Sequence, residues 1–210
     1  MQVRRLGEKM EQRWQREIEE RLLESAEVKK RTAQQCGRPI SQAAEAIASL
    51  LRSGGKLMLC GNGGSAADCQ HIAAEFIGRL GPGLERAPWP AIALTTNTSN
   101  LTALGNDYGF EDIFSRQVEA LGARGDALVA ISTSGKSQNI IKAVEKAKEK
   151  GLLTIGLLGG DGGFLGERVD LAITVPSDNV QRIQEAHITI CHIISELVEQ
   201  ILSTQKEGVV

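Results

Sequence analysis

Two loops of the sequence are rich in the residue types that hold a phosphate group. Each follows an apolar run and precedes a stretch with helical spacing: GNGGSAAD at 61–68 and STSGKSQN at 132–139. The first turn of a helix has free N–H groups and a positive dipole end, so it can bind a phosphate without Lys or Arg. The pair of loops predicts a phosphorylated small molecule as ligand. A third apolar run, 155–163, ends in glycines, and we expect a helix after it as well.

The second loop carries more hydroxyl groups than the start of a helix needs. One capping side chain is enough for a helix N-terminus, yet Ser132, Thr133, Ser134 and Ser137 fall within six positions. Hydroxyls donate hydrogen bonds to phosphate oxygens. We therefore interpret these four residues as a phosphate-binding set.

The first loop allows two interpretations. Gly63 and Gly64 would let a ligand approach the backbone closely, and Asn62 could bond a sugar hydroxyl. An ordinary tight turn explains the same loop, with Ser65 as N-cap and Asp68 completing a capping box. Neither the GxGxxG dinucleotide pattern nor a P-loop is present.

Acid–base or metal chemistry is suggested by a few residues on two predicted helices. His71 and Glu75 are four apart and project from one helical face, where they could share a divalent metal ion or form a simple surface pair. Gln184 and His192 are eight apart, which separates them by about 80° and about 12 Å on the last helix. Long side chains could converge from there. His187 points about 140° away from His192 and is expected in the core or an interface.

Positioning these groups requires strands that alternate with helices. Apolar runs such as LVAIS and TIGLL are typical of strands covered on both faces. The alternation predicts an α/β fold with a doubly wound, parallel, five-stranded sheet flanked by helices, whose ligands bind beyond the carboxyl ends of the strands. We expect strands at 56–61, 91–95, 126–132, 153–158 and 171–175, and helices near 65–80, 110–122, 137–150 and 179–203.

The N-terminal segment is predicted to be a long, charged helix over 8–35, ended by Gly37 and Pro39, with a second helix over 41–52. Its apolar residues recur every four positions from Trp14. This stripe packs either on the domain's own helices or against a second subunit.

Composition narrows the function classes. A net charge of −2 and 3% aromatic residues over 210 positions argue against a nucleic-acid partner. No apolar run approaches the length of a membrane span and the first twenty residues are charged, so we expect a cytoplasmic protein without a membrane partner. The scattered cysteines show no CxxC spacing and are expected to be buried thiols: Cys36, Cys60, Cys69 and Cys191.

The motifs GNGGSAAD, ISTSGKSQN and RIQEAHITICHI together resemble the sugar isomerase (SIS) family and, within it, the phosphoheptose isomerases. The resemblance runs from about residue 40 to 202 and includes PAIAL, GNDYGFEDIFSRQVEALG and GDALVAISTSG. It implies a SIS domain over 41–204, an N-terminal helical extension over 1–40 used for oligomerisation, and a homotetramer with active sites at subunit contacts.

The same resemblance implies isomerisation of sedoheptulose 7-phosphate to a manno-heptose 7-phosphate through an enediolate, which feeds the heptose of bacterial lipopolysaccharide. His71, Glu75, Gln184 and His192 stand where this family binds one zinc ion per subunit. By resemblance, Glu75 is the base and His192 the partner acid–base.

Substrate contacts are also implied by the family pattern. Asn106 and Asp107 would bond sugar hydroxyls, although GNDYG is also typical of a turn. Gln181 stands where relatives carry an Asp, which weakens any proton relay at that position. The full implied set is Asn62, Gly63, Gly64, Ser65, Glu75, Asn106, Asp107, Ser132, Thr133, Ser134, Ser137 and Gln184.

Two alternatives remain. One is a non-catalytic SIS protein that binds a sugar phosphate and regulates, like the replication-initiator-associating homologue, which lacks the Glu and the final His. The other is a SIS isomerase for arabinose 5-phosphate or a hexose 6-phosphate. The presence of Glu75 and His192 favours an isomerase over the regulator.

Overall fold

The computed structural model describes residues 2–80 and 86–204 and confirms the predicted α/β fold. A five-stranded parallel sheet has the order β2-β1-β3-β4-β5. β1 and β3 are buried along their whole length because helices cover both faces of the sheet. All five strands begin at the expected position or within one residue of it, and β2 ends two residues earlier than expected. The bounds are β1 Leu57–Gly61, β2 Ala91–Ala93, β3 Ala127–Ser132, β4 Leu153–Gly159 and β5 Leu171–Val175.

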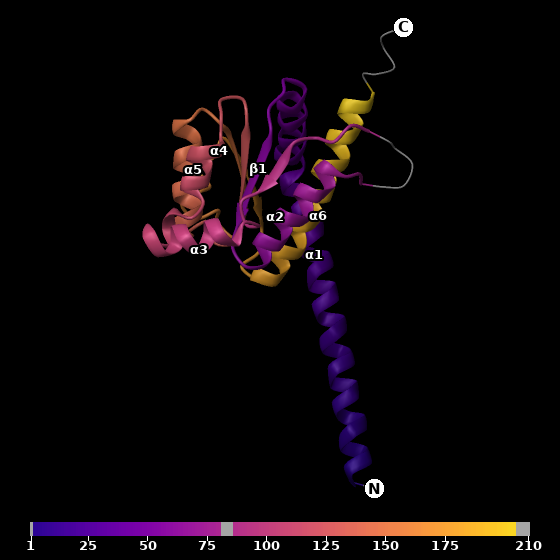
Figure 1. The fold of residues 1–210 in the computed structure, drawn as a ribbon. Coiled ribbons are helices and arrows are strands. Elements are labelled where there is room, and N and C mark those ends of the chain that lie inside the picture. Colours follow the sequence, from indigo (N-terminus) through magenta and orange to yellow (C-terminus); the bar gives the residue numbers. More distant parts are fainter. Residues whose placement is uncertain (1, 81–85, 205–210) are drawn as a thin grey trace.

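The helices form two layers, one on each face of the sheet (Figure 1). Alternate strand residues point to opposite faces, so Leu57 and Leu59 pack under the first layer and Met58 and Cys60 under the second. The first layer contains α1 (Gln2–Arg52), α2 (Gly64–Ile77) and α6 (Val180–Ser203), and the second contains α3 (Thr98–Asp107), α4 (Ser115–Leu121) and α5 (Gln138–Glu149).

The predicted break in the N-terminal helix is wrong. α1 runs without interruption through Gly37 and Pro39, although a proline inside a helix loses one hydrogen bond and costs about 3 kcal/mol. Burial on both sides of the proline outweighs that local cost: Cys36, Ile40 and Ile47 all belong to the core that α1 shares with α6. The N-terminal part of α1 extends away from the rest of the molecule (Figure 1).

Three other local predictions need correction. Residues 98–107 form α3, where only a turn was expected at its end, because Asn97 caps the helix by accepting a bond from the Asn100 N–H at 3.0 Å. The helix expected over 110–122 is a 3-10 turn at Phe110–Asp112 followed by α4. No helix follows the third apolar run, since 160–169 form turns with glycines at positive φ.

All four cysteines are buried and unpaired, as predicted. Burial raises the pKa of the Cys60 thiol to about 12, which keeps it protonated. Among the described helices, none combines the length and apolar character needed to cross a membrane.

Candidate active site between α2 and α6

Three side chains from α2 and α6 converge on one point. His71 and Glu75 lie one turn apart on α2, and the Nε2 atom of His71 is 3.4 Å from Oε1 of Glu75. His192 comes from α6, and its Nε2 atom lies 2.9 Å from that of His71. One ligand atom of each residue lies within 4.8 Å of the other two. From the sequence, a shared site of α2 and α6 was only a suggestion. In the structure, His71 and Glu75 of α2 lie beside His192 of α6.

The spacing of these atoms fits a divalent metal ion. Zinc binds imidazole nitrogen and carboxylate oxygen at about 2.0–2.2 Å with tetrahedral geometry, which places ligand atoms about 3.3 Å apart. The separations of 2.9 and 3.4 Å lie on either side of that value, and the third, between Glu75 and His192, is no more than 4.8 Å. The His71 side chain is 50% exposed, so the cluster is open on one side. A catalytic zinc site needs an open position of this kind.

α2 and α6 run in the same direction along their shared face. Gln184 lies against Gly64, where an added Cβ would come within 2.8 Å of the Gln184 Nε2 atom. Further along, His71 comes seven residues after Gly64 on α2, and His192 comes eight residues after Gln184 on α6. These two side chains are in contact as well. A side chain at position 64 would displace the Gln184 amide from its present place. The Gln184 amide is thus placed on the same side of α6 as the cluster, while its part as a fourth ligand stays a prediction.

Asp68 lies on the face of α2 that carries Gly64 and His71. Its Oδ2 atom is buried and has no hydrogen-bond partner in the described part of the chain. Burial raises the pKa of this carboxyl group, and the nearby His71 and His192 oppose the shift. The predicted capping box is wrong, because the N-cap of α2 is Gly63, no side chain caps the helix, and Ser65 is buried.

The two predicted ligand loops are joined by a pair of amides. Asn62 donates to Asn139 at 2.9 Å and Asn139 donates back at 2.8 Å. Asn139, 3% exposed in the first turn of α5, was missed from the sequence. The only feature of the sequence that could have pointed to Asn139 is its position directly after the hydroxyl-rich loop. The Asn62 side chain therefore holds the two loops in register, which leaves the loop backbone to face a ligand.

Some hydroxyl groups of the 132–137 loop are not needed for hydrogen bonds that hold the loop itself together. Ser132 accepts a bond from the Gly135 N–H at 3.1 Å, which shapes the loop. Ser137 is the N-cap of α5, yet its side chain makes no capping bond, and its hydroxyl accepts only a long bond from the Ser132 hydroxyl, at 3.5 Å. Thr133 and Ser134 line a cavity of about 320 Å³ together with the 159–161 loop and the start of α6. This cavity lies at the carboxyl ends of β3 and β4, where parallel sheets bind ligands.

Asn106 and Asp107 lie in the last turn of α3, in the other helix layer. Both are exposed, and Asn106 donates to the Asp107 carboxylate at 2.8 Å. Their contact with a substrate stays a prediction. His187 lies in the core as expected, with no exposed surface, and its Nε2–H donates to the Leu158 carbonyl at 2.9 Å.

Comparisons with known proteins agree with this geometry. The family model described as SIS domain matches residues 22–159. The phosphoheptose isomerase of Rhodospirillum rubrum is 57% identical over 167 residues, covering 80% of this chain and 88% of its own. That of Geotalea daltonii is 53% identical over 186 residues, covering 89% and 96%.

Solved structures show the same likeness. A phosphoheptose isomerase from Neisseria gonorrhoeae superposes with a TM-score of 0.84 at 43% identity, covering 89% of this chain and 99% of its own. One from Francisella tularensis gives 0.84 at 42% identity, covering 88% and 97%. With these identities over nearly the whole chain, the protein belongs to the phosphoheptose isomerase family of SIS-domain proteins.

Proposed function

We propose that this protein isomerises D-sedoheptulose 7-phosphate to D-glycero-D-manno-heptose 7-phosphate, the first step towards the heptose of bacterial surface polysaccharides. The observation that carries the proposal is the meeting of Glu75 and His192, from separate helices, with ligand atoms no more than 4.8 Å apart. Moving a proton between two neighbouring carbons needs a base beside both of them and a second group for the oxygens. The family's name indicates the heptose substrate.

In this reaction Glu75 takes the proton from C1 and returns it at C2, which passes through an enediolate. His192 moves the accompanying proton between O1 and O2. Asn106 and Asp107 bond sugar hydroxyls, and the backbone at Gly63 and Gly64 lies along the sugar chain. The 7-phosphate binds the hydroxyls of Ser132, Thr133, Ser134 and Ser137 and the free N–H groups at the start of α5.

One zinc ion per subunit is part of the proposal. His71, Glu75 and His192 supply two imidazole nitrogens and a carboxylate oxygen, which is a donor set that suits zinc. Gln184 is proposed as the fourth ligand. The metal supplies positive charge where the oxyanion of the enediolate develops.

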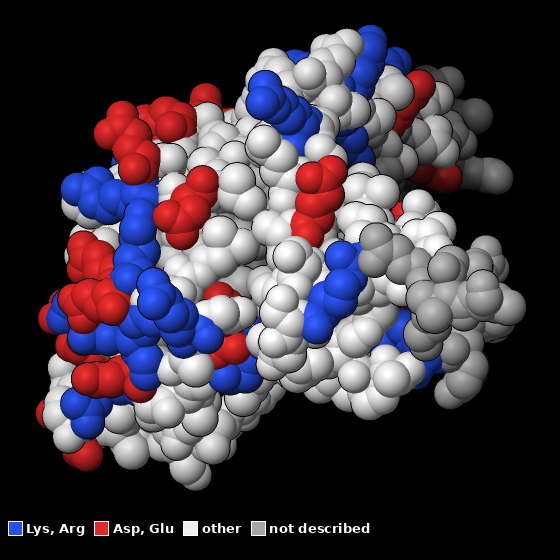
Figure 2. All heavy atoms as spheres, turned by 90° about the horizontal axis from the view of Figure 1, so that it is seen from above, with Lys and Arg blue, Asp and Glu red and all other residues white. Residues whose placement is uncertain are grey.

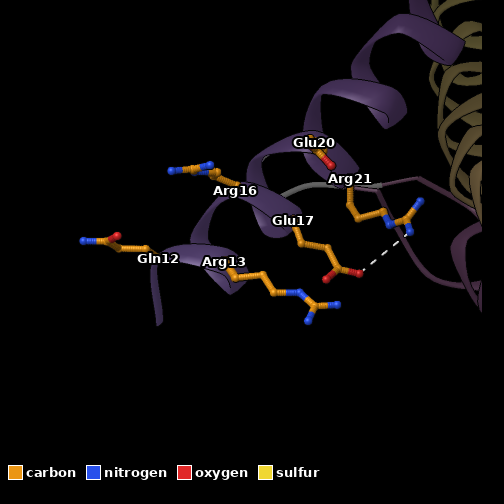
Figure 3. Close-up of a pocket in the computed structure, with 6 residues that line it drawn as sticks. All are labelled: Gln12, Arg13, Arg16, Glu17, Glu20 and Arg21. Atoms are coloured by element: carbon orange, nitrogen blue, oxygen red, sulfur yellow. Dashed lines mark ion pairs between the residues drawn. The ribbon is translucent and has the colours of Figure 1, made fainter. Parts of the chain in front are cut away.

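We also propose that the protein is a cytoplasmic homotetramer and that residues 1–40 serve its assembly. Met10, Trp14, Ile18 and Leu22 lie at spacing four on α1 and are between 51 and 67% exposed. The same part of α1 carries the polar and charged side chains drawn in Figure 3, among them Arg21, 3.9 Å from Glu17. An apolar stripe with charged flanks is the pattern by which helices pair between subunits.

A metal analysis of the purified protein, beside turnover assays on a panel of C5 to C7 ketose phosphates, tests the activity. We expect zinc in the protein and turnover of the heptose substrate alone. Glu75→Gln, with metal occupancy measured, should lose turnover by about 10² or more. No heptose turnover with or without added zinc would instead support the sugar-phosphate-binding regulator.

A further inference from the structure

Arg86 is a buried cation that contacts the end of α2. It follows the undescribed residues 81–85 and precedes β2, and its side chain is only 5% exposed. The guanidinium stacks on the Trp89 ring at 3.7 Å from the centroid. A buried charge needs partners that outweigh the loss of hydration, so the contacts of Arg86 indicate what it does.

Those partners are the last backbone carbonyls of α2. One guanidinium nitrogen donates to the carbonyl of Glu75 at 2.7 Å, and the other donates to the carbonyl of Phe76 at 2.9 Å. Carbonyls at a helix C-terminus lack partners within the helix and carry the negative end of its dipole. Arg86 therefore holds in place the backbone of Glu75, the proposed base.

The third partner of Arg86 lies on α6. Its Nε atom is 3.7 Å from Oε2 of Glu199, whose side chain is 12% exposed. Glu199 is seven residues after His192, about 10.5 Å along the helix and within about 20° of the same face. α2 and α6 thus touch at the His71–His192 pair and again two turns further on, through Arg86.

We propose that Arg86 is a positioning residue which, paired with Glu199, sets the spacing of α2 and α6 and so the distance between Glu75 and His192. The inference rests on the proposed function. A catalytic constellation tolerates about 0.5 Å of displacement, and the two carbonyl bonds from a planar guanidinium give α2 a fixed end that a single ammonium group would not. Nothing in this role requires Arg86 to touch the substrate.

The test separates positioning from stability by comparing single and paired substitutions. Arg86→Met removes the donors to both carbonyls and leaves the Glu199 charge unpaired in the interior, so it lowers stability as well. Arg86→Met with Glu199→Met removes both charges, and such apolar replacement of a buried ion pair often restores stability. The paired variant still lacks the bonds to the Glu75 and Phe76 carbonyls.

Zinc affinity of the metal-stripped protein, kcat, KM and the free energy of unfolding are measured for each variant. We expect the paired variant to be more stable than Arg86→Met but less stable than the wild type, because the carbonyls lose their donors. It should bind zinc about tenfold more weakly, in the range found when supports of a metal site are lost. Its kcat at saturating zinc should fall while KM changes little. Arg86→Lys should recover only part of the zinc affinity.

Lys56→Met is the control, because Lys56 forms another partly buried ion pair, with Asp126, whose hydrogen bonds involve neither α2 nor α6. It should lower stability and leave zinc affinity unchanged. The inference is overturned if the paired variant binds zinc and turns over like the wild type, or if Lys56→Met weakens zinc binding equally. The zinc measurement decides this even in a protein without heptose turnover, in which case the proposed function alone fails.

Discussion

His71 and His192 are 121 positions apart in the chain, yet their Nε2 atoms lie 2.9 Å from each other. Two nitrogens at this distance share either one proton or a metal ion, since two facing N–H groups would repel. The contact also fixes α6 beside α2, because one residue comes from each helix.

The two histidines should differ in what their loss does. His71 is proposed to bind the metal only, so His71→Asn should lower activity at limiting zinc and regain much of it when zinc is added. His192→Asn also removes the proposed acid–base group, and turnover should fall by about 10²–10⁴ without recovery. Plots of kcat against zinc concentration measure both effects. Equal recovery of the two variants would contradict the assignment of an acid–base role to His192.

The strands could be predicted because buried parallel strands have a purely local signature, a short apolar run ending in small residues. Pro39 shows where local signals fail: its effect on the helix is real, but the burial of Ile40 and Ile47 against α6 outweighs it. The spacing of four between His71 and Glu75 correctly predicted that both side chains lie on one face of a helix. The docking of α6 that completes the site is a tertiary contact, which helical periodicity does not encode.

Two site features were beyond prediction for a chemical reason. Asn139 forms hydrogen bonds with Asn62, which is 77 positions away in the chain. Nothing in the sequence around an Asn indicates which distant residue its amide will bond. Arg86 binds backbone carbonyls of α2, and a carbonyl is the same at every residue. Surface charge does not indicate the position of the site either, because Lys and Arg lie among Asp and Glu on the face seen in Figure 2.

Ser137 should matter for binding and hardly for stability. Because its side chain makes no capping bond, Ser137→Ala should change the free energy of unfolding by about 0.5 kcal/mol or less. Loss of a hydrogen bond to a charged phosphate is worth about 1.5–3 kcal/mol, so KM should rise roughly tenfold or more. Denaturant unfolding and steady-state kinetics measure the two quantities.

Asn97→Ala is the control for that prediction. The Asn97 side chain does cap its helix, accepting from the Asn100 N–H, so its loss should lower stability by about 1 kcal/mol. If Ser137→Ala lowered stability as much as Asn97→Ala and left KM unchanged, Ser137 would be a structural cap and not a phosphate ligand.

Charged residues in the α1 stripe should dissociate the oligomer. Trp14→Lys combined with Leu22→Glu would place charges on a face proposed to be buried between subunits, where each large apolar side chain contributes about 1.5–3 kcal/mol. Sedimentation velocity at micromolar concentration should show smaller species. Gln12→Glu, on the polar flank, should sediment like the wild type. An unchanged profile for the double variant would show that the stripe does not hold the subunits together.

His187 should make stability depend on pH between about 4 and 6.5. Burial lowers the pKa of this histidine from 6.5 to about 4 in the folded protein, so below pH 6.5 the unfolded chain binds a proton that the folded one does not. The contribution is complete above about pH 6.5 and is lost as pH falls towards 4. A shift of this size corresponds to about 3 kcal/mol.

His187→Gln isolates that contribution, because an amide does not titrate yet can still donate to the Leu158 carbonyl that His187 contacts at 2.9 Å. The free energy of unfolding, followed by urea titration from pH 4.5 to 7.5, should fall less steeply on acidification in the variant than in the wild type. Any remaining slope in the variant belongs to other groups, such as the Asp126 and Asp170 carboxyls. Burial raises the pKa of each of these carboxyls, but hydrogen bonds to Lys56 and Thr154 outweigh it and leave the pKa lowered. Identical slopes in the two proteins would mean that His187 is protonated in the core, against the direction of the shift that its burial imposes.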